Sequence, residues 1–318
     1  MSYYIGIDLG GTNTKIGVLD SGGNIVSLGG IKTDSNNMIK SLEQIWSEAK
    51  HLLKKINLKE EAVKGIGIGI PGPVINGSIV TFFSNFNWEK NVNLKKEFER
   101  ITNIETRIAN DANIIAQGEA IFGAAKNKKS SITVAIGTGI GGGIFLNGNL
   151  ISGNTGVGGE IGHMKLEKNG RLCGCGQRGC FEAYASAKSL IKEAKERLKN
   201  DKDNLLFKEI EGNIDTLEAK HIFDCAKKGD KFSLELIDYE SEYLAMGIGS
   251  LLNIINPEIL VISGGISLAG NILLNAVREK LKLFSMPPAL ENFELVLGEL
   301  GNEAGIKGAA ALFYSDKK

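Results

Sequence analysis

Short apolar segments alternate with glycine-rich turns at the start of the chain. Residues 3–8, 15–19 and 25–28 are apolar runs of strand length, and a Ser-Gly-Gly-Asn sequence separates the last two. Runs of this length bounded by Gly, Asn and Ser are typical of strands joined by tight turns. We therefore expect the chain to begin as a three-stranded antiparallel meander.

Farther along, the apolar positions change their spacing. Between residues 38 and 56 they recur every three or four positions, which is typical of a helix that buries one face. The same spacing predicts further helices at 95–101, 113–122, 183–198, 217–227, 234–255, 274–281 and 304–313. Apolar runs predict further strands at 65–70, 106–109, 131–136, 143–146, 259–263 and 293–297. Strands interleaved with helices along the whole chain indicate the α/β class.

The opening pattern returns in the middle of the chain. A strand at 131–136, a glycine-rich turn, a strand at 143–146 and an Asn-Gly-Asn turn repeat the arrangement of the N-terminus. Repetition of one supersecondary unit is a sign of internal duplication. With 318 residues, the chain also has room for two domains.

The charge balance and hydropathy exclude several classes of protein. Lys and Arg number 37 and Asp and Glu number 37, so the formal net charge is zero and no nucleic-acid-binding surface is expected. No run of about 18 apolar residues is present, so no membrane-spanning helix is predicted. The N-terminus has neither the basic nor the apolar segment of a signal peptide, and we expect a cytoplasmic protein.

Glycine is abundant, with 41 residues, and it gathers in turns that follow apolar strands. The first such turn contains Gly10, Gly11 and Thr12, directly after Asp8 and Leu9. Because glycine has no side chain, the backbone N–H groups of this turn are able to approach phosphate oxygens closely. Asp8 at the strand end is placed to hold a hydrated Mg²⁺ beside them. A plain glycine hairpin that hydrogen-bonds to Asp8 explains the same residues equally well.

A second glycine run, at 137–143, also follows an apolar strand. It contains the spacing Gly-x-Gly-x-x-Gly, which indicates dinucleotide binding when a helix comes next. Here the next segment, 143–146 with its Asn-Gly turn, is a predicted strand, so the dehydrogenase interpretation fails. We instead expect Gly137, Thr138 and Gly139 to form a phosphate-binding turn, with one nucleotide held between two related halves.

Asn110, Asp111, Ala112 and Asn113 lie between a predicted strand and a predicted helix. Asp is a favoured N-cap, so one interpretation is that Asp111 accepts backbone N–H groups of the helix. The other is a general base that removes a proton from an attacking hydroxyl, a role that contributes about 10²–10⁴ in rate. The two roles compete, because a capping carboxylate has few lone pairs left for catalysis.

Three of the four cysteines lie within eight residues, at Cys173, Cys175 and Cys180, and His163 lies ten residues upstream. Three thiolates and one imidazole satisfy a closed tetrahedral zinc site, and the glycines between them let the chain wrap around the ion. Because four protein ligands leave no open position, we expect this zinc to be structural. Three chance thiols beside a core histidine are the less favoured alternative.

The remaining candidates carry less information. Cys225 lies on the apolar side of a predicted helix and is expected in the core, whereas His51 and His221 are expected at the surface or its boundary. Gly265 follows the strand at 259–263, where a glycine turn fits either a nucleoside site or a plain helix entry.

Taken together, these strings resemble the ROK family of sugar kinases and repressors. The matching strings run through the chain in order: IGIDLGGTNTKIGVLD, IGIGIPGPV, NDAN, GTGIGGGIFLNG, GEIGHM, CGCGQRGCFEAYAS and SGGIS. The cysteine string with Glu-x-Gly-His upstream is highly specific to the family. Repressors of the family carry a helix-turn-helix before the Asp-x-Gly-Gly-Thr string, which here starts at Asp8, so the resemblance favours the kinases.

The resemblance implies an actin-like, ribonuclease H-like duplicated α/β fold whose two domains enclose an active-site cleft. The small N-terminal domain would comprise residues 1–122, completed by a C-terminal helix at about 304–318. The large domain would comprise residues 123–303 and carry the zinc-binding loop. ROK kinases are commonly homodimers, and the resemblance extends that expectation to this chain.

The resemblance also implies roles for individual residues. Asp111 matches the catalytic base, which deprotonates the 6-hydroxyl of the sugar for attack on the γ-phosphoryl group of ATP. Sugar contacts are implied for Gly72, Asn85, Asn110, Asp111, Glu160, His163 and Glu182. Nucleotide contacts are implied for Gly10, Gly11, Thr12, Thr138 and Gly265. His163 thus has two implied roles, with one ring nitrogen on zinc and the other toward a sugar hydroxyl.

The implied activity is Mg²⁺-dependent phosphorylation of a hexose by ATP, with glucose as the expected substrate. Gly159 separates the chain from fructokinase-like members, which tend to carry proline there, but not from N-acetylmannosamine kinases. A kinase of N-acetylmannosamine or another N-acetylhexosamine is therefore the first alternative. A sugar sensor without catalysis is the second, and the presence of Asp111 and of both glycine turns argues against it.

Overall fold

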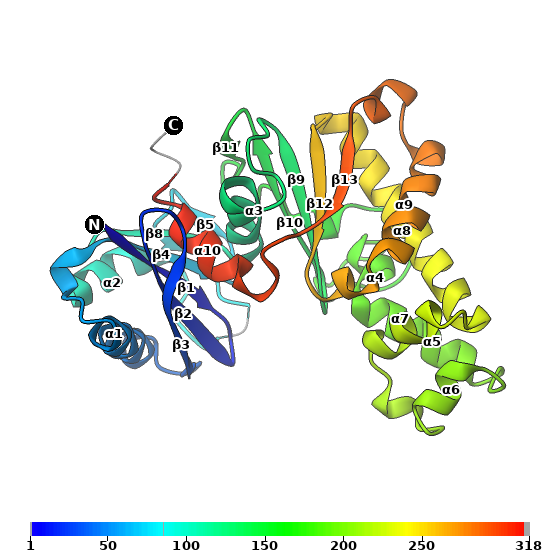
Figure 1. Ribbon diagram of the computed structural model, residues 1–318, viewed down its shortest axis with the longest axis horizontal. Coiled ribbons are helices and arrows are strands. Elements are labelled where there is room, and N and C mark those ends of the chain that lie inside the picture. The colour runs from blue at the N-terminus through cyan, green and yellow to red at the C-terminus, as the bar shows by residue number, and fades with distance from the viewer. Residues whose placement is uncertain (1, 85, 315–318) are drawn as a thin grey trace. The chain divides into compact units, whose positions relative to one another are not determined.

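The computed structural model describes residues 2–84 and 86–314 (Figure 1). The chain divides into two compact units. The first unit comprises the described residues up to Thr133, Gly143–Gly159 and the described residues from Glu299 onward. The second unit comprises Val134–Gly142 and Glu160–Gly298.

Strands and helices are interleaved along the described chain, as the apolar pattern predicts. The strands are β1 (Tyr3–Leu9), β2 (Asn13–Leu19), β3 (Ile25–Lys32), β4 (Val63–Ile70), β5 (Val74–Ile75), β6 (Ile79–Val80), β7 (Val92–Asn93), β8 (Thr106–Asn110), β9 (Ser131–Ile136), β10 (Ile140–Leu146), β11 (Asn149–Leu150), β12 (Ile259–Ser263) and β13 (Glu294–Leu297). The α-helices are α1 (Met38–Lys55), α2 (Leu94–Thr102), α3 (Asp111–Phe122), α4 (Glu182–Ala185), α5 (Ala187–Leu198), α6 (Leu205–Glu209), α7 (Ala219–Lys227), α8 (Lys231–Ile255), α9 (Asn271–Phe284) and α10 (Ala304–Ala311). Among the described helices, none combines the length and the apolar character needed to cross a membrane.

Two five-stranded sheets share one strand order. The first is β3-β2-β1-β4-β8 and the second is β11-β10-β9-β12-β13. If the five strands of each sheet are numbered in chain order, both sheets have the order 3-2-1-4-5. In the first sheet β1 pairs antiparallel with β2 and parallel with β4, and β4 pairs parallel with β8. In the second sheet β10 pairs antiparallel with β11, and β12 pairs parallel with β13. The shared order is what the repeated turn pattern predicts for an internal duplication.

The first sheet is packed on both faces by helices. Ile5, Ile7 and Leu9 of β1 are buried in one core with Leu42 and Ile45 of α1. Because side chains alternate along a strand, the residues between them face the other side, toward α10.

On that other side, α10 lies directly against the backbone of the sheet (Figure 1). A Cβ atom at Gly6 would lie 2.0 Å from the carbonyl oxygen of Ile306, and one at Gly67 would lie 1.8 Å from that of Ala309. These glycines therefore serve close helix-to-sheet packing.

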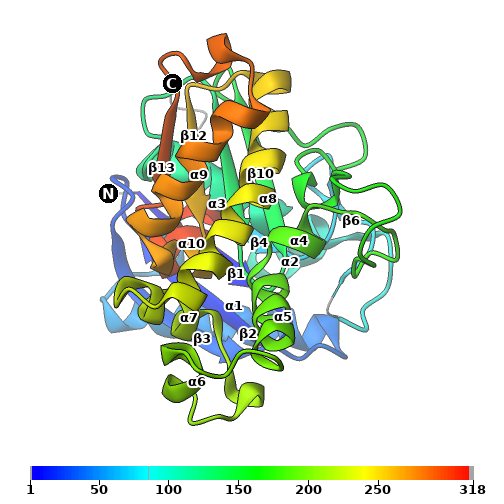
Figure 2. The ribbon, with the colours of Figure 1, turned by 90° about the vertical axis from the view of Figure 1, so that its right-hand side faces the viewer.

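In the second unit, helices α8 and α9 pack side by side (Figure 2). Helix α8 begins after Asp230, whose carboxylate accepts the backbone N–H of Ser233, and ends at Asn256 in the left-handed conformation. Asparagine is common at such a helix terminus, because its short side chain tolerates positive φ. Every residue of the neighbouring strand β12 is buried.

Several elements differ from the sequence-based expectation, among them the two-residue strands β5, β6, β7 and β11, which were not predicted. β10 begins at Ile140, so Gly141, Gly142 and Gly143 belong to a strand and the glycine turn is shorter than predicted. The single helix predicted at 183–198 is broken at Ser186, which has extended backbone and caps α5 through the N–H of Ser189. Serine competes in this way with helix continuation, because its hydroxyl offers the backbone an alternative partner. Helix α6 was not predicted.

Candidate functional site

Three parallel strands of the first sheet end at the same edge. Asp8 in β1 pairs with Gly69 in β4, and Ile70 in β4 pairs with Asn110 in β8. Gly72 follows β4 and Asp111 follows β8, so the structure gathers four predicted residues at this edge: Asp8, Gly72, Asn110 and Asp111. Ligands of open α/β sheets bind outside the carboxyl ends of the strands, where these residues lie.

Helix α3 is capped by Asn110, whereas Asp111 is its first helical residue. The Oδ1 atom of Asn110 accepts the backbone N–H groups of Ala112 at 3.0 Å and Asn113 at 3.3 Å. Its Nδ2 group donates to the carbonyl oxygen of Gly72 at 3.3 Å, which joins the ends of β4 and β8. The N-cap of α3 is therefore Asn110 and not Asp111. This reduces the competition between capping and base catalysis at Asp111.

Asp111 itself is half-buried at the N-terminus of the helix. Its Oδ1 atom lies 2.8 Å from the backbone nitrogen of Ala112 and accepts its N–H. The helix dipole stabilises negative charge in the first turn. The N–H of Ala112 therefore orients the Asp111 carboxylate at the start of the helix, as a proton acceptor must be oriented.

The glycine turn between β1 and β2 is supported by hydroxyl groups. Gly10 donates its N–H to the carbonyl oxygen of Asn13 at 3.1 Å. Thr33 donates its hydroxyl to the carbonyl oxygen of Gly10 at 2.7 Å, and this hydroxyl lies 2.8 Å from that of Thr14. Its backbone N–H also donates to the carbonyl oxygen of Thr12 at 3.0 Å. Thr33 was not predicted as a site residue, because nothing in the local sequence marks a residue that folds back on this turn.

Asp8 lies beside the same turn, against the start of α10. A Cβ atom at Gly305 would lie 2.5 Å from its Oδ2 atom. Burial raises the pKa of Asp8, and the charge of Lys15 partly offsets this rise. A divalent cation beside the carboxylate would favour the ionised form in the same way as the lysine.

The glycine turn between β9 and β10 lies next to the turn after β12. Gly264, with φ of 85°, packs against β9, since a Cβ atom there would lie 2.5 Å from the carbonyl oxygen of Ile136. Gly137 and Gly265, the next residues on either side of this contact, have open surroundings in the described chain, with nothing within 4 Å of an added Cβ atom. Thr138, directly after Gly137, is exposed. The structure therefore brings the predicted nucleotide residues of the second unit together.

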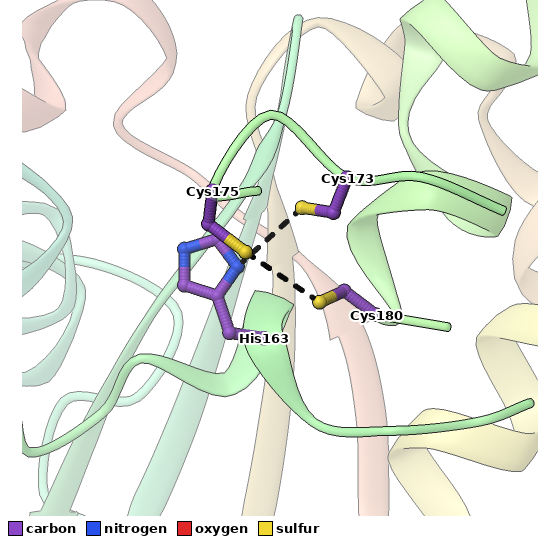
Figure 3. Close-up of side chains that lie close together, drawn as sticks. All are labelled: His163, Cys173, Cys175 and Cys180. Carbon is purple, nitrogen blue, oxygen red and sulfur yellow. Dashed lines mark hydrogen bonds between the residues drawn. The ribbon is translucent and has the colours of Figure 1, made fainter. Parts of the chain in front are cut away.

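Four metal-binding side chains of the second unit converge (Figure 3). The ligand atoms of His163, Cys173, Cys175 and Cys180 all lie within 4.8 Å of one another. The Sγ atoms of Cys175 and Cys180 are 3.7 Å apart, and Nδ1 of His163 is 3.8 Å from Sγ of Cys173. A tetrahedron with Zn–S bonds of about 2.3 Å has S···S edges of about 3.8 Å, so the cluster fits a zinc ion.

Thiol ionisation in this cluster is uneven. Burial raises the pKa of the Cys173 thiol to about 12. The backbone N–H of Gln177 lowers the pKa of the Cys175 thiol. Because zinc binds thiolates, loading the site must displace the proton of Cys173.

Lys165 accompanies the metal cluster and was not predicted. Its Nζ atom lies 2.9 Å from Sγ of Cys180, across the antiparallel bridge that joins these two residues. Zn²⁺ with three thiolates and a neutral imidazole carries a net charge of about −1, which an adjacent lysine offsets. The bridge forms only when the loop folds, so the local sequence around Lys165 gives no sign of it.

The predicted sugar residues of the second unit surround the metal cluster. Because Nδ1 of His163 faces the sulfurs, its Nε2 atom faces outward and lies 3.8 Å from Oε2 of the exposed Glu160. Glu182 begins α4, and its Oε1 atom lies 3.4 Å from Sγ of Cys173. The structure therefore brings Glu160, His163 and Glu182 to one place, whereas Asn85 lies outside the described residues.

The remaining cysteine and histidines lie where the sequence predicts. Cys225 is buried in α7. His51 is exposed, and His221 is half-buried, with its Nδ1 atom accepting the backbone N–H of Glu218 at 3.2 Å. None of these three residues belongs to the strand-end residues, the glycine turns or the metal cluster described above.

Comparison with known proteins connects these residue sets to one family. The ROK family profile matches residues 4–316. A glucokinase of Thermotoga maritima is 37% identical over 310 residues, which cover 97% of this chain and 96% of the relative. A xylose repressor of Bacillus subtilis is 30% identical and covers 98% of this chain, but only 76% of the repressor is matched.

The fold agrees with the sequence comparison. The crystal structure of a ROK family glucokinase from Streptomyces griseus in complex with glucose and AMPPNP matches with a TM-score of 0.82 at 30% identity. The match covers 98% of this chain and 99% of that chain. The actin-like, ribonuclease H-like α/β fold expected from the sequence is thereby confirmed. This chain belongs to the ROK family.

Proposed function

We propose that the chain is a glucokinase, which transfers the γ-phosphoryl group of ATP to the 6-hydroxyl of glucose. The observation that carries the proposal is the end of β8, where Asn110 caps α3 and Asp111 occupies the first turn of the helix. Relatives named glucokinase match along almost the full length of the chain, and one such protein was solved with glucose and AMPPNP. These matches support the choice of substrate and phosphoryl donor.

In the proposed reaction, Asp111 accepts the proton of the 6-hydroxyl. The hydroxyl oxygen forms a bond to the γ-phosphorus while the bond to the β-phosphate oxygen breaks, so the products are glucose 6-phosphate and ADP. Phosphoryl transfer depends chiefly on positioning and on electrostatic stabilisation of the phosphates. Backbone N–H groups of Gly11, Thr12, Thr138 and Gly139 would supply that stabilisation, with Gly265 against the nucleoside. The N–H groups of Gly10 and Gly137 close the two turns on Asn13 and Gly139.

The two metals have different proposed roles. Asp8 would hold Mg²⁺ together with the phosphates, and this ion would neutralise charge during transfer. His163, Cys173, Cys175 and Cys180 would hold a structural Zn²⁺, because four protein ligands complete its coordination. Sugar hydroxyls would contact Gly72, Asn85, Asn110, Asp111, Glu160, His163 and Glu182.

Further parts of the proposal concern the whole protein. We infer a homodimer in the cytoplasm, as the resemblance to ROK kinases implies. Domain limits at 1–122 with 304–318, and at 123–303, stay predictions, as does a cleft in which sugar and nucleotide meet.

The test is release of ADP from Mg-ATP with a panel of sugars: glucose, mannose, fructose, N-acetylmannosamine and N-acetylglucosamine. We expect kcat/KM for glucose to lead by at least about tenfold, or about 1.4 kcal/mol in transition-state binding. A lead for N-acetylmannosamine would move the chain to amino-sugar kinases and keep Asp111 as the base. Absence of ADP release with every sugar, together with retained sugar binding, would favour a sensor and overturn the kinase proposal.

A further inference from the structure

We propose that the metal loop holds the Gly137–Gly139 turn in its nucleotide-binding conformation through Glu182, so that zinc loading sets nucleotide affinity. Glu182 thereby becomes a positioning residue for the phosphate-binding turn, in addition to any sugar contact. The inference rests on the proposed function only in taking this turn as a nucleotide-binding element. All residues involved belong to the second unit.

One carboxylate contacts both the metal cluster and the turn. Glu182 follows Cys180 by two residues, and its Oε1 atom lies 3.4 Å from Sγ of Cys173. Its Oε2 atom accepts the backbone N–H of Ile140 at 3.0 Å, directly after the turn. The N–H of Ile140 is a donor that keeps the carboxylate in place at the end of the turn.

The turn is fitted closely to this carboxylate. A Cβ atom at Gly139 would lie 2.1 Å from Oε2 of Glu182, so the turn is able to approach the carboxylate only because residue 139 is glycine. Gly137 donates its N–H to the carbonyl oxygen of Gly139 at 2.9 Å, which closes the turn on itself. A shift of Glu182 would therefore change the backbone of the whole turn.

Two further contacts connect the turn to the metal-bearing segments. Gly162, which precedes the ligand His163, packs against the carbonyl oxygen of Ile140, since a Cβ atom there would lie 2.1 Å from it. Ala187 at the start of α5 donates its N–H to the carbonyl oxygen of Gly137 at 3.0 Å. The N–H and the carbonyl of Ile140 thus contact segments on both sides of the cysteine string.

Zinc would connect the segment that carries Gly162 to the segment that carries Glu182. His163 lies on the segment of Gly162, and Cys180 lies on the segment of Glu182. With the ion bound, the two segments share a common ligand centre, and the turn between them is preorganised for phosphate oxygens. Without the ion, the bridge between Lys165 and Cys180 still joins the two segments, but the ligand side chains no longer share one centre. Nucleotide binding must then supply more of the free energy of ordering the turn.

The experiment measures binding of AMPPNP by calorimetry in the absence of sugar, so that sugar contacts of Glu182 play no part. The full-length chain is compared with Glu182→Ala, Glu182→Gln and the control Glu167→Ala, which removes an exposed carboxylate from the same loop. Zinc content is determined for each sample. Amide hydrogen exchange at Gly139 and Ile140 reports the turn directly, with or without nucleotide.

We expect Glu182→Ala to bind zinc normally, to weaken AMPPNP binding about tenfold and to accelerate exchange at Ile140. Glu182→Gln retains an acceptor oxygen and should bind AMPPNP within about twofold of the unmodified chain, as should Glu167→Ala. Removing zinc should weaken AMPPNP binding in the unmodified chain. In Glu182→Ala the same treatment should weaken binding only slightly further, because the contact between residue 182 and the turn is already lost.

Two results separate failure of this inference from failure of the proposed function. Unchanged exchange at Ile140 and unchanged AMPPNP binding in zinc-loaded Glu182→Ala would overturn the inference and leave the kinase proposal intact. If no form binds AMPPNP, the proposed function fails. In that case faster exchange at Ile140 in Glu182→Ala would still show that Glu182 holds the turn, and unchanged exchange would refute this role.

Discussion

The turn between β1 and β2 in the first unit and the turn between β9 and β10 in the second occupy equivalent places in two sheets of the same strand order. The first is supported by the hydroxyl of Thr33, which donates to Gly10. The second is supported by the carboxylate of Glu182, which accepts from Ile140 beside a metal cluster. Duplicated sheets therefore keep their strand order while the groups that support their turns diverge. In the described chain, the carboxylate that supports the second turn also contacts the cluster of zinc-binding residues.

Buried carboxylates differ between the two units in a similar way. Glu119 of α3, in the first unit, accepts the N–H groups of Ala124 at 2.9 Å, Glu299 at 3.3 Å and Leu300 at 3.2 Å. Glu240 of α8, in the second unit, is fully buried and neither of its oxygens has a hydrogen-bond partner in the described chain. Glu119 holds two chain segments together, whereas Glu240 is expected to lower stability because its buried oxygens have no hydrogen-bond partner in the described chain.

The largest effect is expected for Asp111→Asn, which tests whether the chemistry belongs to the first unit. The amide is nearly isosteric but cannot accept the proton of a sugar hydroxyl, so kcat should fall by about 10²–10⁴. Steady-state ADP release measures the change, and circular dichroism with zinc content checks the fold. Turnover near that of the unmodified chain would remove Asp111 as the base.

Zinc removal tests whether the metal stabilises the second unit. We expect about one zinc ion per chain, and chelation should lower the Tm by about 10 °C, since a tightly bound ion contributes about 4 kcal/mol at a thousandfold excess over its Kd. Differential scanning calorimetry before and after chelation, with zinc added back, measures the effect. A metal-free preparation with unchanged Tm and full activity would contradict the assignment of a structural zinc.

Glu119→Ala sharpens the comparison of the buried carboxylates. The substitution leaves three backbone N–H groups without their acceptor, and each unsatisfied buried group costs about 1–3 kcal/mol, partly recovered by relaxation. We expect a loss of about 2–4 kcal/mol in the free energy of unfolding, with a smaller loss for Glu119→Gln. Urea denaturation measures both variants, and equal stability of Glu119→Ala and the unmodified chain would rule out the support role.

Glu240→Leu should have the opposite sign. Burial raises the pKa of Glu240 well above its ordinary value, despite the charge of Arg171. Below the pKa of an unfolded-state glutamate the side chain is protonated in both states. As pH rises above it the unfolded chain loses the proton first, so stability falls until the folded pKa is passed. We expect Glu240→Leu to raise the free energy of unfolding by about 1–3 kcal/mol at pH 8 and by less at pH 5.

Urea denaturation of Glu240→Leu and the unmodified chain at both pH values is the measurement. The gain in stability should grow from pH 5 to pH 8, because only the unmodified chain has this titrating group. A variant that is less stable than the unmodified chain at pH 8 would show that Glu240 has a stabilising partner, and the contrast with Glu119 would fail.

Several features were predictable because they depend on neighbours in the chain. The cysteine string and His163 span 18 residues, and their spacing alone indicates a zinc site, which the converging ligand atoms support. Strand and helix positions followed from the spacing of apolar residues. The similar glycine turns indicated the internal duplication that the equal strand order of the two sheets reflects.

Other features depend on residues that are far apart in the sequence. Glu182 meets Ile140 across 42 positions, and Glu119 meets Leu300 across 181. Likewise, Gly6 contacts Ile306 of α10, although the residues are 300 positions apart. No local pattern marks such partners, because each contact exists only after strands have paired and helices have packed.

The sequence by itself determined the residue types available for chemistry: a carboxylate at Asp111, two glycine turns and four metal ligands close together in the chain. Tertiary structure decided how they are used. It assigned the cap of α3 to Asn110 and placed Lys165 beside Cys180. Local spacing fixes ligand sets and turns because these depend on backbone geometry over a few residues. The partner of a carboxylate depends on packing, which brings distant donors within hydrogen-bond distance.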